Sequence, residues 1–388
     1  MKTLTRLLLI AGLLLALTAA LQAQSSPTGV NAGNATGIQP YNSYGGVREN
    51  INLANGNLNL QIPLLTLPGR NGHDLGIGLE YDSKIWQLHS EFIMETGEWW
   101  YWWDVEYRLP AAGYVGWRLS LPSIQSSDGQ FGIMNPTFCT MNFVVTLADG
   151  SKHPFGNRNN CTDSNGSPRP SSNVPISDSE DASFMRLDTS TSEAVVHLKD
   201  GTRIHFAGGS SVPVVASKIV DPDGNVITIT QTGGLVSKIT DTVGREVTFT
   251  WTAQLSSISY KDSSGTTRTI SLTYTNRILA PDFQSPIEAF DPAPITVPLL
   301  SSITLPNGLS YTFEYDNNQS TNTYGELTKI KYPTGGYTRY DYGRFTADIA
   351  DFREVVARRV CRNSSGSCGT EDVTTYTPTI NALANEYM

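Results

Sequence analysis

A glycine-centred turn followed by a strand-like tail recurs along the chain. The stretches KIVDPDGNVITI (218–229) and KITDTVGREVTF (238–249) share Lys-Ile, a polar turn at glycine and an alternating tail, although most of their polar letters differ. DG, NG and GG dipeptides are signals for hairpin turns. The pattern therefore predicts a series of β-hairpins. The repeated turn glycines are Gly150, Gly201, Gly224, Gly244, Gly265, Gly308 and Gly335.

Large apolar side chains stand five positions after each turn glycine, at Phe155, Phe206, Ile229, Phe249, Ile270, Phe313 and Tyr340. Isoleucines stand five positions before four of the glycines, at Ile219, Ile239, Ile303 and Ile330, and Ile258 is a shifted counterpart before Gly265. In the tail GREVTFTW (244–251) apolar and polar letters alternate, which places the apolar side chains on one face. A single hairpin cannot bury such a face alone, so copies must stack side by side.

The spacing of the glycines defines the repeating unit. Those at 201, 224, 244 and 265 lie about 20 residues apart, which is room for two short strands and two turns. The step from Gly265 to Gly308 is about double and leaves room for one degenerate copy. A content of 34 Gly, 21 Pro and 17 Tyr suits strands and turns. We predict an all-β fold of stacked β-hairpin repeats that form an extended curved sheet or partial shell.

The N-terminus has the three-part plan of a secretory signal peptide. Lys2 and Arg6 precede the uncharged stretch LLLIAGLLLALTAA (7–20), and cleavage is expected after Ala23. A membrane-spanning helix needs about 20 apolar residues, so this stretch is too short for an anchor, and no membrane span is expected once it is removed. The sequence predicts an exported protein that is periplasmic, on the cell surface or extracellular.

Four cysteines fall into two local pairs, which in an exported chain indicates disulfides. Three connectivities are possible, and we favour Cys139–Cys161 and Cys361–Cys368 because each closes a short polar loop. The five histidines are scattered and no CxxC occurs, so we expect no metal and no cofactor. A net charge of −9 without a run of basic residues argues against nucleic-acid binding.

The stretches DPDGNVITI, DTVGREVTFTW, LPNGLSYTFEYD and YGELTKIKYPTGGYTRYDY resemble the RHS/YD-repeat family. Tyr315-Asp316 and Tyr340-Asp341 are similar to its Tyr-Asp signature. The stretches NLANGNLNLQIPLLTLPGRNG (52–72), LGIGLEYDSKIW (75–86) and YVGWRLSLPSI (114–124) resemble the leader that precedes such repeats in large secreted bacterial proteins. The resemblance covers residues 42 to 342.

Members of this family wind their repeats into a β-sheet shell that often encloses a toxic C-terminal domain. The resemblance therefore implies a structural protein, the wall or scaffold of a secreted or cell-surface shell linked to toxin encapsulation or delivery. It also implies a further RHS-type chain or shell partner. The chain lacks the family's downstream core and toxin stretches, so we expect a truncated member or one partner of a split shell.

Composition divides the chain into six regions. We expect the signal peptide at 1–23, a flexible lead-in at 24–41, a β-rich leader region at 42–160, a loop or linker at 161–181 and the repeats at 182–345. A C-terminal segment with a disulfide loop occupies 346–388. Proline-rich residues 280–298 are expected to form an insertion between hairpins, and residues 350–360 (ADFREVVARRV) a short helix or an irregular edge.

An aromatic cluster supplies the best candidate binding site, with Trp99, Trp100, Trp102, Trp103, Asp104 and Tyr107 as its members. Aromatic rings stack on sugar faces and carboxylates accept hydroxyl hydrogen bonds, so the alternative function is a carbohydrate-binding module for a cell-surface polysaccharide. The competing interpretation is that the rings pack into the sheet and cover its edge.

Catalysis is not expected. Glu98, Asp104 and Glu106 offer paired carboxylates for glycoside hydrolysis, and a glycan-active enzyme is the second alternative. No GxSxG occurs, and no histidine stands where it suggests the base of a Ser or Cys nucleophile. Asp221, Asp223 and Asn225 imitate part of a calcium loop, but the aligned copies DTVGR and LPNG lose the oxygen ligands while keeping the turn. Turn chemistry explains them better.

Overall fold

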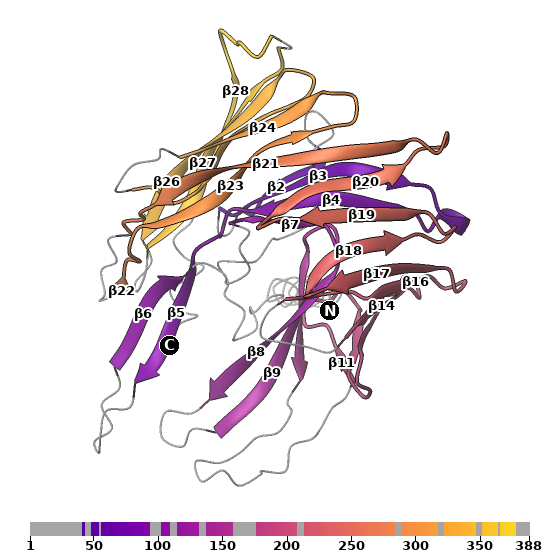
Figure 1. Ribbon diagram of the computed structural model, residues 1–388. Coiled ribbons are helices and arrows are strands. Elements are labelled where there is room, and N and C mark those ends of the chain that lie inside the picture. The colour runs from indigo at the N-terminus through magenta and orange to yellow at the C-terminus, as the bar shows by residue number, and fades with distance from the viewer. Residues whose placement is uncertain are drawn as a thin grey trace, which may run out of the picture.

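The computed structural model has an all-β architecture, which confirms the predicted class (Figure 1). It describes residues 41–42, 48–53, 56–93, 102–108, 115–131, 137–157, 176–207, 213–283, 289–316, 322–346, 351–363 and 365–377. Within these ranges the only helical element is a 3-10 turn at Arg70–Gly72.

One antiparallel sheet of 16 strands dominates the structure, and it is not closed into a barrel. Its strands follow chain order except that β15 and β22 belong to other sheets. The strands are β11 (Ile176–Asp178), β12 (Arg186–Asp188), β13 (Ala194–His197), β14 (Arg203–Phe206), β16 (Lys218–Val220), β17 (Val226–Thr232), β18 (Leu235–Thr240), β19 (Glu246–Trp251), β20 (Leu255–Lys261), β21 (Thr267–Leu279), β23 (Ile295–Thr304), β24 (Ser310–Tyr315), β25 (Leu327–Lys331), β26 (Tyr337–Thr346), β27 (Asp351–Cys361) and β28 (Asp372–Thr375).

All seven turn glycines adopt the same conformation, with φ between 81° and 101°. At Gly224 the amide donates to the carbonyl of Asp221, and the Asp221 amide donates to the carbonyl of Asn225, both at 3.1 Å. The equivalent two bonds form at the other six turns. This is a type I turn closed by a glycine bulge, which needs the positive φ that glycine adopts without a steric cost.

The side chains five positions after these glycines are all buried, with at most 6% of their surface exposed. The pairing register explains their spacing. Ile229 lies opposite Ile239, Phe249 opposite Ile258 and Phe313 opposite Ile330. Each tail therefore packs beside the isoleucine of the next copy, which makes the apolar face continuous.

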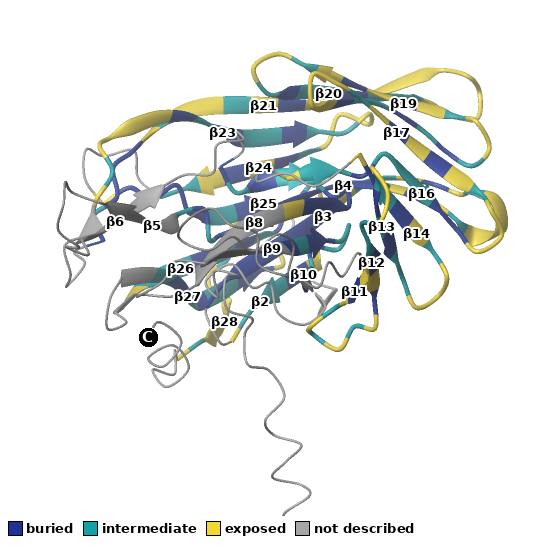
Figure 2. Ribbon diagram, turned by 90° about the horizontal axis from the view of Figure 1, so that it is seen from below, coloured by how far each residue is buried: buried dark blue, intermediate teal, exposed yellow. Residues whose placement is uncertain are grey.

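A five-stranded inner sheet packs against the concave face of the long sheet (Figure 2). Its order is β1 (Tyr41–Asn42), β2 (Arg48–Ile51), β3 (Leu58–Leu67), β4 (Leu75–Asp82) and β7 (Trp117–Leu119). Leu58, Leu60 and Ile62 on β3 are fully buried and belong to one hydrophobic core with the long sheet's Ile239 and Ile258. Leader and repeats thus fold around a shared core.

Two smaller sheets link the leader to the repeat region. One is ordered β10 (Lys152–Asn157), β9 (Thr137–Thr146), β8 (Ser123–Phe131) and β15 (Val214–Val215). The other is ordered β22 (Ala289–Phe290), β6 (Trp102–Arg108) and β5 (Gln87–Ile93). Because β15 and β22 come from the repeat region, the two regions interlock.

Three details differ from the sequence-based expectations. The long sheet starts at Ile176 and continues to Thr375, beyond the expected repeat range of 182–345 at both ends. Residues 351–361 form strand β27, which pairs with β26 and β28 and has a bulge at Val356. Its Val355 and Val360 are buried, so the segment is a strand inside the sheet and not a helix. Among the described residues between Gly265 and Gly308, the long strands β21 and β23 pair directly, without a further hairpin of the long sheet between them.

Candidate functional site

The Trp-rich segment is only partly described. Trp99, Trp100 and the preceding Glu98 lie outside the described residues. Trp102, Trp103, Asp104, Glu106 and Tyr107 lie on β6, which pairs antiparallel with β5 and parallel with β22. Their side chains also lie outside the described part, so the sugar-binding and glycan-cleaving interpretations stay predictions.

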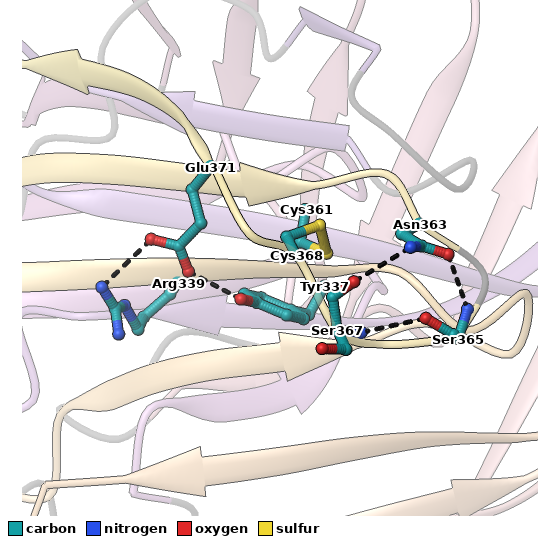
Figure 3. The surroundings of a disulfide bond; sticks show 8 residues. All are labelled: Tyr337, Arg339, Cys361, Asn363, Ser365, Ser367, Cys368 and Glu371. Carbon is teal, nitrogen blue, oxygen red and sulfur yellow. Dashed lines mark hydrogen bonds and ion pairs between the residues drawn. A yellow bond between two sulfur atoms is a disulfide. The ribbon is translucent and has the colours of Figure 1, made fainter.

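The C-terminal disulfide pairs Cys361 with Cys368, as expected from their spacing, with their Cα atoms 5.8 Å apart (Figure 3). Cys361 is fully buried at the end of β27. Beyond the loop, Glu371 accepts hydrogen bonds from Tyr337 at 2.7 Å and from Arg339 at 3.1 Å, which fixes the start of β28. The expected partners Cys139 and Cys161 lie outside the described side chains.

The calcium-like stretch is a turn. The two carboxylate oxygens of Asp221 accept hydrogen bonds from the backbone amide and the side-chain amide of Asn225, each at 2.7 Å. The hydrogen bonds from Asn225 lower the pKa of Asp221 despite opposing desolvation. In the described part of the chain no three His, Cys, Asp or Glu residues group as a metal site.

The structure brings a serine, a histidine and an aspartate together, a contact that sequence analysis did not anticipate. The Oγ of Ser151 lies 2.8 Å from Nε2 of His153, whose Nδ1 lies 2.6 Å from a carboxylate oxygen of Asp181. Ser151 directly precedes β10, His153 lies on β10 two residues later, and Asp181 is brought by the β11–β12 turn. Only the tertiary structure brings Asp181 to the pair.

The hydroxyl of Ser151 also contacts a carboxylate, that of Asp149. Asp149 accepts from the Ser151 hydroxyl at 2.6 Å and from its amide at 3.0 Å. Asp262 with Ser264 and Asp181 with Ser183 repeat this local pattern, which is ordinary turn chemistry. Because the hydroxyl proton is already directed to Asp149, the arrangement ties β10 to the β11–β12 turn rather than activating a nucleophile.

A cavity of about 330 Å³ lies between the inner strands and the long sheet. One wall comes from β4 and β7 and from the sheet of β8, β9, β10 and β15, and the other comes from β18, β19, β20, β21 and β23 of the long sheet. Its deepest apolar lining residues are fully or almost fully buried: Leu79, Trp117, Leu121, Val236, Leu255 and Leu300. The more exposed lining residues are Gln125, Pro213, Gly234 and Leu235. The second group marks the side from which solvent reaches the cavity.

Two ion pairs lie on the side of this cavity that the leader region forms. Lys152 Nζ lies 2.9 Å from Asp82, and Arg118 pairs with Glu80, which is 1% exposed and lies behind the lining. Burial raises the pKa of Asp82, but Lys152, the backbone amide of Lys84 and Arg118 together outweigh burial, and the pKa is lowered. Burial of Glu80 raises its pKa although Arg118 opposes the shift.

A buried charge cluster joins the leader to the long sheet at one end of the cavity. Lys84 donates to the carbonyl of Arg353 at 2.7 Å, and the Arg353 guanidinium binds both carboxylate oxygens of Glu326 at 2.9 and 3.0 Å. Burial lowers the pKa of Lys84 to about 8 and raises that of Glu354. Burial and the Glu326 charge raise the pKa of Asp316 to about 7.

Polar aromatic side chains form a series of hydrogen bonds that sequence analysis missed. Trp251 donates to the carbonyl of Val236, and Tyr274, Tyr315 and Tyr342 donate to the carbonyls of Leu255, Leu300 and Leu327, over 2.6 to 3.1 Å. Each lies just after a register shift in its strand. Trp251, Tyr315 and Tyr342 stand seven positions after a turn glycine, a spacing that was available as a signal.

No family model matches the chain, and no curated protein matches it. Among solved structures, a chain of the Tc holotoxin pore of Photorhabdus luminescens matches with a TM-score of 0.24 and 12% identity. The match covers 84% of this chain and 16% of that chain, so this chain spans a small part of its length. At this identity and TM-score the likeness assigns neither a family nor a function.

The described residues contain no helix that is long and apolar enough to cross a membrane.

Proposed function

We propose that the chain is an exported structural protein that forms the wall or scaffold of a β-shell assembly of the RHS/YD-repeat type. The observation that supports this most is the stacking of hairpins with one turn geometry into a 16-stranded curved sheet. On β19 the buried Val247 and Phe249 alternate with the exposed Glu246, Thr248 and Thr250. One face of the strand is therefore apolar and buried, and the other is polar and exposed to solvent. Such a sheet separates an interior from solvent.

Export is part of the same proposal. The disulfide between Cys361 and Cys368 is typical of proteins outside the reducing cytoplasm, and the N-terminal sequence has the plan of a signal peptide. A link to toxin encapsulation or delivery rests on the resemblance of the repeats alone. We propose no catalytic activity, since the Ser151 network is explained by turn structure.

The edge of the long sheet supports the proposal of a shell partner. Strand β28 is the last strand of the described sheet, it is exposed throughout, and Val373 is 49% exposed on it. A strand at the edge of a sheet leaves one row of backbone N–H and C=O groups without a neighbouring strand, which is a template for pairing with another chain. We propose that a further chain of the shell extends the sheet at this edge.

The test measures the mass of residues 24–388 by light scattering after size-exclusion chromatography, over a range of concentrations. We expect association that Val373→Lys abolishes, because lysine on an edge strand blocks pairing. The matched control is Val226→Lys, which adds the same charge at a 38% exposed site on the central strand β17 and should leave association unchanged. A wild-type monomer at every concentration contradicts the wall proposal.

A polysaccharide panel distinguishes the alternatives. Binding that is lost in a folded Trp100→Ala, Trp102→Ala variant identifies a sugar-binding module instead of a wall. Glycan cleavage that is lost in Glu98→Gln, Asp104→Asn or Glu106→Gln without loss of fold identifies an enzyme. We expect neither binding nor cleavage.

A further inference from the structure

The cavity between the inner strands and the long sheet has the properties of a small-molecule site. Its volume of about 330 Å³ falls within the range of ligand pockets, and its floor is made by buried apolar side chains such as Leu255, Leu300 and Trp117. Exposed residues at one side, among them Gln125 and Leu235, give it a mouth. The site is independent of the wall function proposed above.

The polar groups of the lining aromatics argue against a ligand that binds through many hydrogen bonds. Trp117 Nε1 donates to Tyr315 at 2.7 Å, Trp251 Nε1 to Val236 at 2.6 Å, and the Tyr274 hydroxyl to Leu255 at 3.0 Å. These groups are satisfied within the protein, so the rings offer the cavity apolar surface. A sugar, which needs a partner for each buried hydroxyl, fits this lining poorly.

The charges around the cavity favour an anion. Among the charged lining residues, Lys84, Arg118 and Lys152 are cationic and Asp82 alone is anionic. Glu80, the partner of Arg118, lies behind the wall, so three cations face two carboxylates and the group keeps a net charge of +1. The side chains of Arg118 and Lys152 are 29% and 21% exposed, so both cations are nearer to solvent than the apolar floor. An anionic group held there can direct an apolar tail inward.

We propose that this cavity binds a monomeric anionic amphiphile, a carboxylate with an apolar chain of medium length. The carboxylate contacts Arg118 and Lys152, since a guanidinium and an ammonium bind carboxylate oxygens through charge-assisted hydrogen bonds. The chain lies on Leu255, Leu300 and Trp117, where its burial supplies most of the binding free energy.

The experiment uses isothermal titration calorimetry on residues 24–388 with decanoate, decanol and decyltrimethylammonium as length-matched probes. We expect one decanoate to bind per chain with a negative heat-capacity change, because apolar surface is buried. Decanoate should bind about twofold to fivefold more tightly than decanol, which is the contribution of a partly exposed ion pair. Decyltrimethylammonium should bind most weakly. Equal affinity for all three probes, or no binding, overturns the proposal.

Variants locate the site and its charge. Lys152→Gln should weaken decanoate by the same factor and leave decanol unchanged, whereas Lys199→Gln, on an exposed turn away from the cavity, should change neither. Leu235 is 40% exposed at the mouth, so Leu235→Glu and Leu235→Lys test charge without disturbing the core. The first should weaken decanoate and the second should not. Equal effects of the two, with circular dichroism showing both folded, contradict an anion site here.

Discussion

The indole Nε1 of Trp117 donates a 2.7 Å hydrogen bond to the hydroxyl of Tyr315, which joins β7 of the inner sheet to β24 of the long sheet. The same hydroxyl donates to the carbonyl of Leu300 at 2.8 Å. Burial raises the pKa of Tyr315, so the hydroxyl keeps its proton and can serve both partners. The inner sheet and the long sheet are thus connected by a satisfied polar contact inside the shared core.

Tyr315→Phe should reduce the free energy of unfolding by about 1–3 kcal/mol, because it leaves both the Trp117 N–H and the Leu300 carbonyl without their partner. Tyr274→Phe is the matched variant. It removes a single bond, to Leu255, and should cost about 0.5–1.5 kcal/mol. Urea unfolding measures both, and equal losses contradict a contribution from the Trp117–Tyr315 contact.

The turn glycines should differ sharply from glycines in extended backbone. Gly244→Ala should cost about 1–2 kcal/mol because φ is +89°, although a Cβ there meets nothing within 4 Å. Gly150→Ala should cost more, since its Cβ would lie 2.4 Å from Glu80 Oε1. Gly76→Ala, with open space and no positive φ, is the control and should be nearly neutral. Thermal unfolding of the three variants tests the order.

Asp316 should make stability depend on pH. Its pKa rises from 3.8 to about 7 on folding, mainly through burial, so the folded state holds a proton that the unfolded state releases between those values. The contribution of Asp316 to stability is therefore fully present below pH 3.8 and is lost as pH rises to about 7, by roughly 2–4 kcal/mol. Asp316→Asn should flatten that part of the curve. Parallel curves for wild type and variant, from urea unfolding at pH 4 to 8, contradict this assignment.

Removal of the C-terminal disulfide should act mainly on the edge strand β28. A loop of this length contributes about 2–3 kcal/mol through the entropy of the unfolded chain. We expect the Cys361→Ser, Cys368→Ser variant to lose that amount and to exchange the amide hydrogens of β28 faster. Amides of β19, far along the sheet, are the internal reference. Unchanged exchange in β28 means that Glu371 and its partners hold the strand without the disulfide.

Sequence alone determined the repeating hairpins, because a glycine bulge and a two-residue alternation are local rules that each copy satisfies by itself. Gly224, Gly244 and the buried Ile229 and Phe249 follow from these rules. Residues 351–361 were not predictable in the same way. The charged residues of this segment break the alternation of apolar and polar residues, so the burial of Val355 and Val360 is not evident from the sequence. Pairing with β26 and β28 makes the segment a strand.

Tertiary structure decided everything that depends on contacts between distant segments. The contacts of Lys84 with Arg353, Trp117 with Tyr315 and Ser151–His153 with Asp181 join strands that no local pattern places together. The cavity exists because an inner sheet that is apolar on the face toward the repeats packs inside their curvature without filling it. The local alternation of apolar and polar residues specifies a strand and its buried face. Which buried faces pack together depends on contacts between segments that are far apart in the sequence.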